Sequence, residues 1–212
     1  MLLHTIDHFL RRRYEKYPVE KWVRLVIPLC LCFFILFTGF ILKGDKEGFF
    51  AGSILLNILK EVPLIGETVS SFVILPGETF YWLPYLHHCF FLPLVVILLL
   101  KGHIRDWLPD QKFVLAATIG LFAYALAVRM PLDIPPQASI PSVKGPWFFL
   151  GVQELLRIVP PLFAGFVIPF SFLLLLLFLP MIKGGWGLAT RYFIIASFFL
   201  YTMLTTVVFF LP

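Results

Sequence analysis

Five apolar stretches, each about twenty residues long, constrain this chain more than any other feature of its sequence. A helix of about twenty apolar residues is long enough to cross the hydrocarbon core of a bilayer. The chain is 60% hydrophobic and only 14% charged, a composition that excludes an ordinary soluble domain. We therefore predict an all-α, polytopic helical membrane protein with about five transmembrane helices, at residues 22–42, 82–101, 112–128, 162–182 and 192–211.

The basic residues predict an orientation for these spans. Of the 17 lysines and arginines, eleven fall on the side of the N-terminus and six on the opposite side. The positive-inside rule then predicts a cytoplasmic N-terminus and a C-terminus on the outer face. Because the basic residues flank spans and form no separate domain, nucleic-acid binding is not expected. Residues 1–21 are expected to lie along the cytoplasmic surface as an amphipathic segment. There His4 and His8 are spaced for a metal ion, although a solvated helix face is the preferred interpretation.

Two loops on the outer side are too long and too apolar to be simple connectors. Residues 43–81 are predicted to form two short amphipathic surface helices, separated near Pro63. Residues 129–161 begin with several prolines and end in a helical pattern that carries Gln153, Glu154 and Arg157. The two loops are predicted to roof a pocket for an apolar ligand. Interfacial anchoring by Trp and Phe accounts for the same residues equally well.

Two histidines in the second apolar span, His88 and His103, indicate a possible cofactor. Fifteen residues of regular α-helix turn about 60° beyond whole turns and rise roughly 22 Å, so both histidines would lie near one face, one towards each membrane surface. Neutral imidazole is a common axial ligand of haem iron, which suggests two haems stacked across the membrane. Histidines at the wet ends of a span would show the same spacing, so this alternative stays open.

Several segments, in order and nearly in spacing, resemble the third and fourth helices of cytochrome b and the paired surface helices between them. The span 82–101 and its histidine interval look like those of the bf-type cytochromes, in which the interval is one residue longer than in the mitochondrial type. The last three spans resemble the separate small subunit of bf-type complexes, fused here to the preceding pair. The residues that carry the likeness are Thr38-Gly39-Phe40-Ile41-Leu42, residues 49–57, Val62-Pro63-Leu64-Ile65-Gly66, Thr79, Leu86-His87-His88, Pro93, Pro135-Pro136, Trp147-Phe148-Phe149-Leu150 and Leu155-Leu156-Arg157.

The resemblance implies that His88 binds the iron of the haem b nearer the outer face and His103 that of the haem nearer the cytoplasm. The family supplies the opposite ligands from a second helix, which this chain lacks, so each haem would be shared with a partner subunit that carries the first two cytochrome b helices. His87 is an alternative to His88. Sixteen residues of regular helix would turn it about 160° away from His103, which favours His88.

The resemblance also implies a quinone site under the two outer loops, and there the sequence departs from the family. The Pro-Glu-Trp-Tyr motif of the family appears as Gly145-Pro146-Trp147-Phe148, so its carboxylate is missing, and the arginine expected at the start of the fourth helix is Trp82. Glu154 is the nearest replacement as the acceptor of a quinol proton, unless it simply pairs with Arg157. The expected quinone-site residues are Phe49, Phe50, Ala51, Gly52, Pro63, Trp147, Phe148 and Glu154.

These patterns divide the chain into a cytoplasmic segment (1–21), a haem-binding helix pair with surface helices (22–110) and a three-helix part with a quinone-site loop (111–212). They predict an electron-transfer subunit of a split cytochrome b in a bacterial cytoplasmic membrane, within a complex that holds cytochrome c, iron–sulfur subunits or both. Two alternatives remain: a haem-free membrane anchor that binds quinone or lipid, and a proton-coupled transporter. The absence of an inverted repeat argues against transport.

Overall fold

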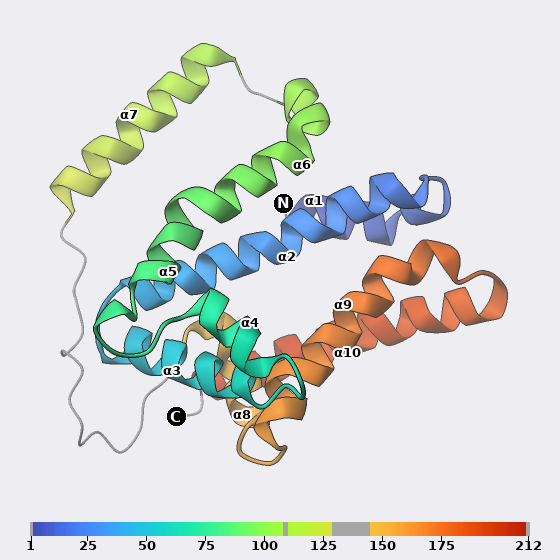
Figure 1. Ribbon diagram of the computed structural model, residues 1–212. Coiled ribbons are helices and arrows are strands. Elements are labelled where there is room, and N and C mark those ends of the chain that lie inside the picture. The colour runs from blue at the N-terminus through green and yellow to red at the C-terminus, as the bar shows by residue number, and fades with distance from the viewer. Residues whose placement is uncertain (1, 108–109, 129–144, 211–212) are drawn as a thin grey trace.

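The computed structural model describes residues 2–107, 110–128 and 145–210, and within these ranges the secondary structure is helical, with no β-strand. Ten α-helices are joined by short 3₁₀ and π turns (Figure 1). The α-helices are α1 (Leu2–Leu10), α2 (Val19–Leu42), α3 (Lys46–Lys60), α4 (Gly66–Val73), α5 (Trp82–Leu86), α6 (Leu92–Trp107), α7 (Gln111–Ala127), α8 (Leu150–Leu155), α9 (Ile168–Phe178) and α10 (Gly184–Phe210). The 3₁₀ turns are Arg13–Glu15, Gly77–Thr79, Trp147–Phe149 and Leu179–Met181, and the π turns are His87–Phe91 and Phe163–Val167.

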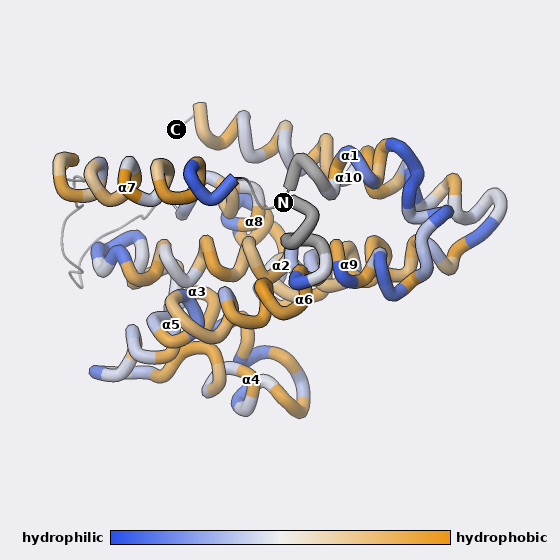
Figure 2. The backbone as a smooth tube through the Cα atoms, turned by 90° about the horizontal axis from the view of Figure 1, so that it is seen from above, coloured by the Kyte–Doolittle hydropathy of each residue, from blue (hydrophilic) through white to orange (hydrophobic). Residues whose placement is uncertain are grey.

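Four helical stretches in the described part of the chain are long and apolar enough to cross a membrane. They are Val19–Leu42, Gly77–Gly102, Phe163–Met181 and Gly184–Phe210. The remaining predicted span corresponds to α7, which is apolar but has only 17 residues. Hydrophilic residues gather near the ends of the long helices, and hydrophobic residues fill the lengths between them (Figure 2). The all-α, multi-pass architecture is therefore confirmed, with four helical stretches in the described residues that are long enough to span, rather than about five.

The N-terminal end of α2 lies in a cluster of buried side chains that joins the N-terminal segment to the region where α9 ends and α10 begins. Trp22 is fully buried, and its indole N–H donates a hydrogen bond to the carbonyl oxygen of Leu176 in α9 at 2.8 Å. The Tyr14 ring packs on Trp22 with their centroids 5.6 Å apart, and Arg191 of α10 donates to the carbonyl of Leu10 at 3.1 Å. The N-terminal segment thus packs on α2, α9 and α10. The buried members of this cluster are Phe9, Tyr14, Trp22, Leu25, Val26, Leu179 and Ile194.

The expectation of a solvated face for His8 is wrong. His8 is only 5% exposed, and its ring lies 5.7 Å from that of Tyr17. Burial follows from the position of α1, because Thr5, His8 and Phe9 lie on the side of this helix that is covered. The side chain of His4 lies outside the described residues, and no group of three or more His, Cys, Asp and Glu suited to a metal ion occurs within them.

The opposite end of α2 carries both of the long loops, as the sequence predicts. Asp45 caps α3 by accepting a hydrogen bond from the backbone N–H of Gly48 at 2.9 Å. After Pro63 the chain turns into α4, so the two short helices and the break between them are confirmed, while their place on a membrane surface stays a prediction. The loop from the second half of the chain reaches the same end, since Phe149 packs against Phe37 of α2 with their centroids 4.8 Å apart.

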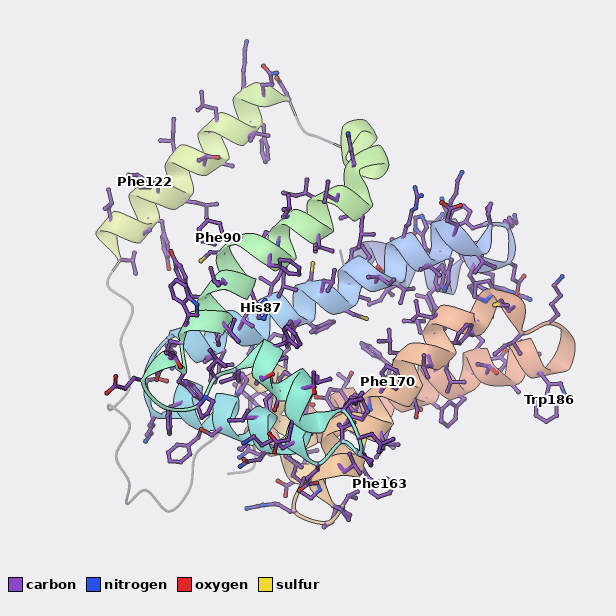
Figure 3. All side chains as sticks on the ribbon, viewed as in Figure 1. His87, Phe90, Phe122, Phe163, Phe170 and Trp186 are labelled. Atoms are coloured by element: carbon purple, nitrogen blue, oxygen red, sulfur yellow. The ribbon has the colours of Figure 1, made fainter. Side chains whose placement is uncertain are left out.

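Helix α7 stands apart from the other helices (Figure 1). All of its residues are exposed, among them Phe113, Leu121, Phe122 and Leu126. Figure 3 shows Phe122 on this isolated helix and Phe90 in the π turn that leads into the neighbouring α6. An apolar helix exposed on every side is stable only where lipid or protein covers it, which agrees with a membrane location.

Candidate functional site

His88 lies in the π turn between α5 and α6. These three elements form one continuous helical rod, and His88 lies where the rod contacts α2. Its Nδ1 atom lies 2.9 Å from the carbonyl oxygen of Ile35 and 3.4 Å from Oγ1 of Thr38. A carbonyl oxygen only accepts hydrogen bonds, so Nδ1 carries the hydrogen. In the neutral ring, Nε2 then keeps its lone pair. A hydrogen bond from one ring nitrogen to a backbone carbonyl is the usual way in which a metal-binding histidine is oriented.

Gly39 provides the space that the ring of His88 occupies. A Cβ atom at residue 39 would lie 2.6 Å from Cε1 of His88 and 3.1 Å from its Nδ1. Such contacts are far inside van der Waals distance, so only glycine allows the imidazole to lie this close to α2. The Thr38-Gly39 pair therefore shapes the surroundings of His88 from the facing helix and lets its imidazole pack directly on α2.

The π turn at His87–Phe91 corrects the helical phase expected from the sequence. A π turn takes up one more residue than an α turn, so His88 and His103 are separated by about fourteen regular steps, which leaves them about 40° short of whole turns. Both positions still lie near one face. The same turn brings His87 to about 60° from His103 instead of about 160°, so helical phase no longer separates His87 from His88.

The two histidines differ instead in which ring nitrogen is hydrogen-bonded to a backbone carbonyl. Nε2 of His87 lies 2.7 Å from the carbonyl oxygen of Phe72, so this nitrogen carries the hydrogen and is already engaged. The ring lies between Phe34 of α2 and Phe91, at centroid distances of 6.3 and 6.0 Å. Figure 3 shows His87 on the side of the rod that faces α2 and α4. His87 thus ties the segment α5–α6 to the end of α4, and its other nitrogen, Nδ1, is buried without a hydrogen-bond partner, whereas the nitrogen that His88 leaves unbonded is Nε2.

His103 lies in α6, close to its C-terminal end, and its backbone continues the regular helix. Its side chain lies outside the described residues. Pro135 and Pro136 also lie outside them.

Three of the expected quinone-site residues meet in one apolar cluster at the loop end of α2. Phe49, Ala51 and Phe148 pack around four buried side chains, those of Phe37, Ile41, Ile74 and Phe80. Gly52 lies beneath Phe80, because a Cβ atom there would come within 2.6 Å of Cζ of that ring. The first loop and the second loop therefore contribute to a single wall of aromatic side chains.

The other expected members lie at the edge of this wall or away from it. Phe50 contacts Phe49 edge to face at a centroid distance of 5.7 Å. Trp147 is 65% exposed and contacts Phe148 at 5.5 Å. Pro63 is exposed in the turn before α4 and lies outside the buried cluster.

Glu154 pairs with a neighbouring arginine, as one of the two sequence interpretations expected. Its Oε1 atom accepts a hydrogen bond from Nη1 of Arg157 at 2.8 Å, and its side chain is 33% exposed. The adjacent Gln153 accepts a hydrogen bond from the backbone N–H of Gly145 at 2.7 Å. Gln153 thus closes the turn that carries Trp147 and Phe148, while Glu154 remains accessible at its edge.

Some residues that shape the site are not evident from the sequence. Ile35 and Phe72 act through backbone carbonyls, which leave no mark on residue type. Glu61, at the end of α3, accepts a hydrogen bond from the backbone N–H of Leu162 at 3.0 Å and so joins the first loop to the start of the next helical stretch. Tyr201 of α10 donates to the carbonyl of Phe148 at 2.7 Å. The Thr38-Gly39 pair, in contrast, could be recognised in the sequence through its resemblance to cytochrome b.

Comparison with known proteins identifies the family of the chain. The family model described as cytochrome b(N-terminal)/b6/petB matches residues 1–126, more than half of the chain. The chain belongs to this cytochrome b family. It is 30% identical over 108 residues to the menaquinol:cytochrome c reductase cytochrome b subunit of Geobacillus thermodenitrificans, an alignment that covers 49% of this chain and 48% of that protein. The subunit of the same name from Bacillus subtilis gives the same values.

The family likeness continues beyond residue 126. Cytochrome b of Candida albicans is 24% identical over 216 aligned positions, covering 85% of this chain and 55% of that protein. The chain spans about half the length of the relatives that it matches. The several long apolar helices and these relatives make it a multi-pass membrane protein.

Proposed function

We propose that this chain is the membrane electron-transfer subunit of a split cytochrome b, which exchanges electrons between quinol or quinone and two b-type haems. The observation that carries the proposal is the hydrogen bond from Nδ1 of His88 to Ile35, because it leaves Nε2 as the nitrogen that would hold a haem iron. Family membership and the names of the bacterial relatives support it. A bound haem supplies reversible one-electron transfer, and the protein fixes its distance, ligation and surroundings.

Each haem is shared with a second subunit in this proposal. His88 holds the haem nearer the outer face and His103 the haem nearer the cytoplasm. Of the other histidines, His87 is engaged by Phe72, and His8 is buried with the opposite end of α2. A partner subunit that carries the first two cytochrome b helices would supply the other histidine to each haem. Cytochrome c, iron–sulfur subunits or both complete the complex in a bacterial cytoplasmic membrane, with the N-terminus of this chain on the cytoplasmic side.

Quinone binds against the aromatic wall in this proposal. Phe49, Ala51 and Phe148 offer flat or small apolar surfaces to a quinone ring, and Gly52 lets Phe80 lie close to α3. Phe50 and Trp147, which contact Phe49 and Phe148, line the outer edge, whereas Pro63 lies outside the cluster. Glu154 lies at this edge as the carboxylate that accepts the quinol proton, and Arg157 orients it.

The proposal is tested on the intact complex purified from its own membrane. Addition of a menaquinol analogue is expected to reduce low-spin b haem, with two haems for each copy of this chain. An intact complex without b haem would contradict the proposal and favour a haem-free anchor. Purification of this chain alone with stoichiometric bis-histidine haem would contradict the sharing of haems.

A further inference from the structure

Tyr201, near the middle of the second half of α10, makes a contact that links the last span to the quinone-site loop. Its hydroxyl donates a hydrogen bond to the carbonyl oxygen of Phe148 at 2.7 Å. Phe148 belongs to the 3₁₀ turn Trp147–Phe149, which precedes α8. The contact joins residues 53 positions apart, so it fixes the turn relative to a long helix rather than within its own loop.

Gly151 allows the two elements to lie this close. A Cβ atom at residue 151 would lie 2.6 Å from Cε2 of Tyr201 and 2.9 Å from Oγ1 of Thr205. Gly151 is buried, and Leu150 beside it is 1% exposed. The first turn of α8 therefore packs directly on α10. The ring of Tyr201 fills the space that the side chain of any residue other than glycine at position 151 would need.

The position of Phe148 and Phe149 decides how the second loop meets the first. The Phe149 ring packs edge to face on Phe37 of α2, and both phenylalanines belong to the cluster that includes Phe49 of α3. A shift of the carbonyl held by Tyr201 moves the backbone that carries these two rings. It consequently changes the separation between the two loops that form the wall.

We propose that Tyr201 is a positioning residue of the quinone site: its hydroxyl holds the turn Trp147–Phe149 at the separation from α3 that a quinone ring requires. This inference rests on the proposed function. Tyr201 acts through the backbone of Phe148 and need not touch the quinone. Its loss therefore weakens quinol binding more than it slows electron transfer to haem.

The test uses the intact complex with Tyr201→Phe, which keeps the ring and removes only the hydroxyl. Loss of one hydrogen bond of about 1 kcal/mol corresponds to an approximately fivefold change, so we expect the apparent KM for a menaquinol analogue to rise about fivefold, with kcat within about twofold of wild type. Tyr192→Phe is the matched control, because Tyr192 lies on the same helix, is 59% exposed and belongs to the opposite end. It is expected to leave KM unchanged.

Gly151→Ala is the second variant, since its methyl group displaces the Tyr201 ring while the hydroxyl is retained. It is expected to raise KM in the same direction, and the double variant is expected to be less than additive because both changes disturb one contact. If Tyr201→Phe leaves KM at the wild-type value, or lowers only the yield of complex, the positioning role is overturned. Failure of menaquinol to reduce haem in the wild-type complex would instead overturn the proposed function, so the two failures are distinguishable.

Discussion

Nδ1 of His88, in the π turn between α5 and α6, donates a hydrogen bond to the carbonyl oxygen of Ile35 in α2 at 2.9 Å. The preceding residue, His87, uses its other ring nitrogen, because its Nε2 donates to the carbonyl of Phe72 at 2.7 Å. Two adjacent and chemically identical side chains thus present opposite nitrogens to the protein. Only His88 keeps Nε2 available, which gives the pair distinct roles in the proposed haem site.

The close approach of His88 to α2 depends on Gly39. Gly39→Ala places a methyl group 2.6 Å from Cε1 of His88, so the ring must move and lose its bond to Ile35. Overpacking of this kind costs about 1–3 kcal/mol, and we expect a lower thermal midpoint of the complex together with lower occupancy of the outer haem. Gly120→Ala in α7 is the control, because a Cβ atom there meets nothing within 4 Å. Equal haem content and stability in the two variants would show that Gly39 has no such role.

Alkaline pH is expected to loosen the N-terminal cluster through Tyr14. Burial raises the pKa of Tyr14 above its ordinary value of 10.0, while Arg191 and Arg12 oppose the shift. The folded protein then keeps the phenol proton that the unfolded chain releases. The stability that the buried phenol of Tyr14 contributes is therefore fully present below pH 10. It is lost as the pH rises from there through the pKa of Tyr14 in the folded protein. Thermal midpoints measured from pH 8 to pH 11 should decline less steeply in Tyr14→Phe, and identical slopes would refute this assignment.

The role of Glu154 can be separated from that of its ion pair. Glu154→Gln removes the carboxylate, whereas Arg157→Gln removes only the partner that it binds at 2.8 Å. A general base contributes about 10²–10⁴-fold to rate, so we expect turnover with menaquinol to fall at least about a hundredfold in the first variant. The second is expected to lose far less. Normal turnover in Glu154→Gln would eliminate Glu154 as the proton acceptor, and equal losses in both variants would assign the effect to the ion pair.

Much of the architecture could be predicted because bilayer thickness sets the length of apolar helices. The spans, the break of the surface helices at Pro63 and the meeting of both long loops at one end of α2 all follow from apolar length and proline placement. The N-terminal segment was predicted less well. Its basic residues suggested a solvated surface helix, yet tertiary packing buries His8 and Tyr14 against α2, α9 and α10.

The contacts that distinguish His88 from His87 could not be predicted from the sequence. The choice of His88 over His87 rested on the phase of a regular helix, and the π turn at His87–Phe91 removes that argument. The choice is instead supported by two backbone carbonyls, which no residue pattern records. Similarly, Phe49 and Phe148 could be grouped by their resemblance to a quinone site, but the hold of Tyr201 on that turn depends on a contact between residues far apart in the sequence.

We propose that His88, and not its neighbour His87, binds the iron of the outer haem. The most direct test is the reduced-minus-oxidised absorbance spectrum of the purified complex for wild type, His88→Leu and His87→Leu. We predict that His88→Leu loses one of the two b haems and that His87→Leu retains both. Retention of both haems in His88→Leu, or loss of the outer haem in His87→Leu alone, would contradict this account.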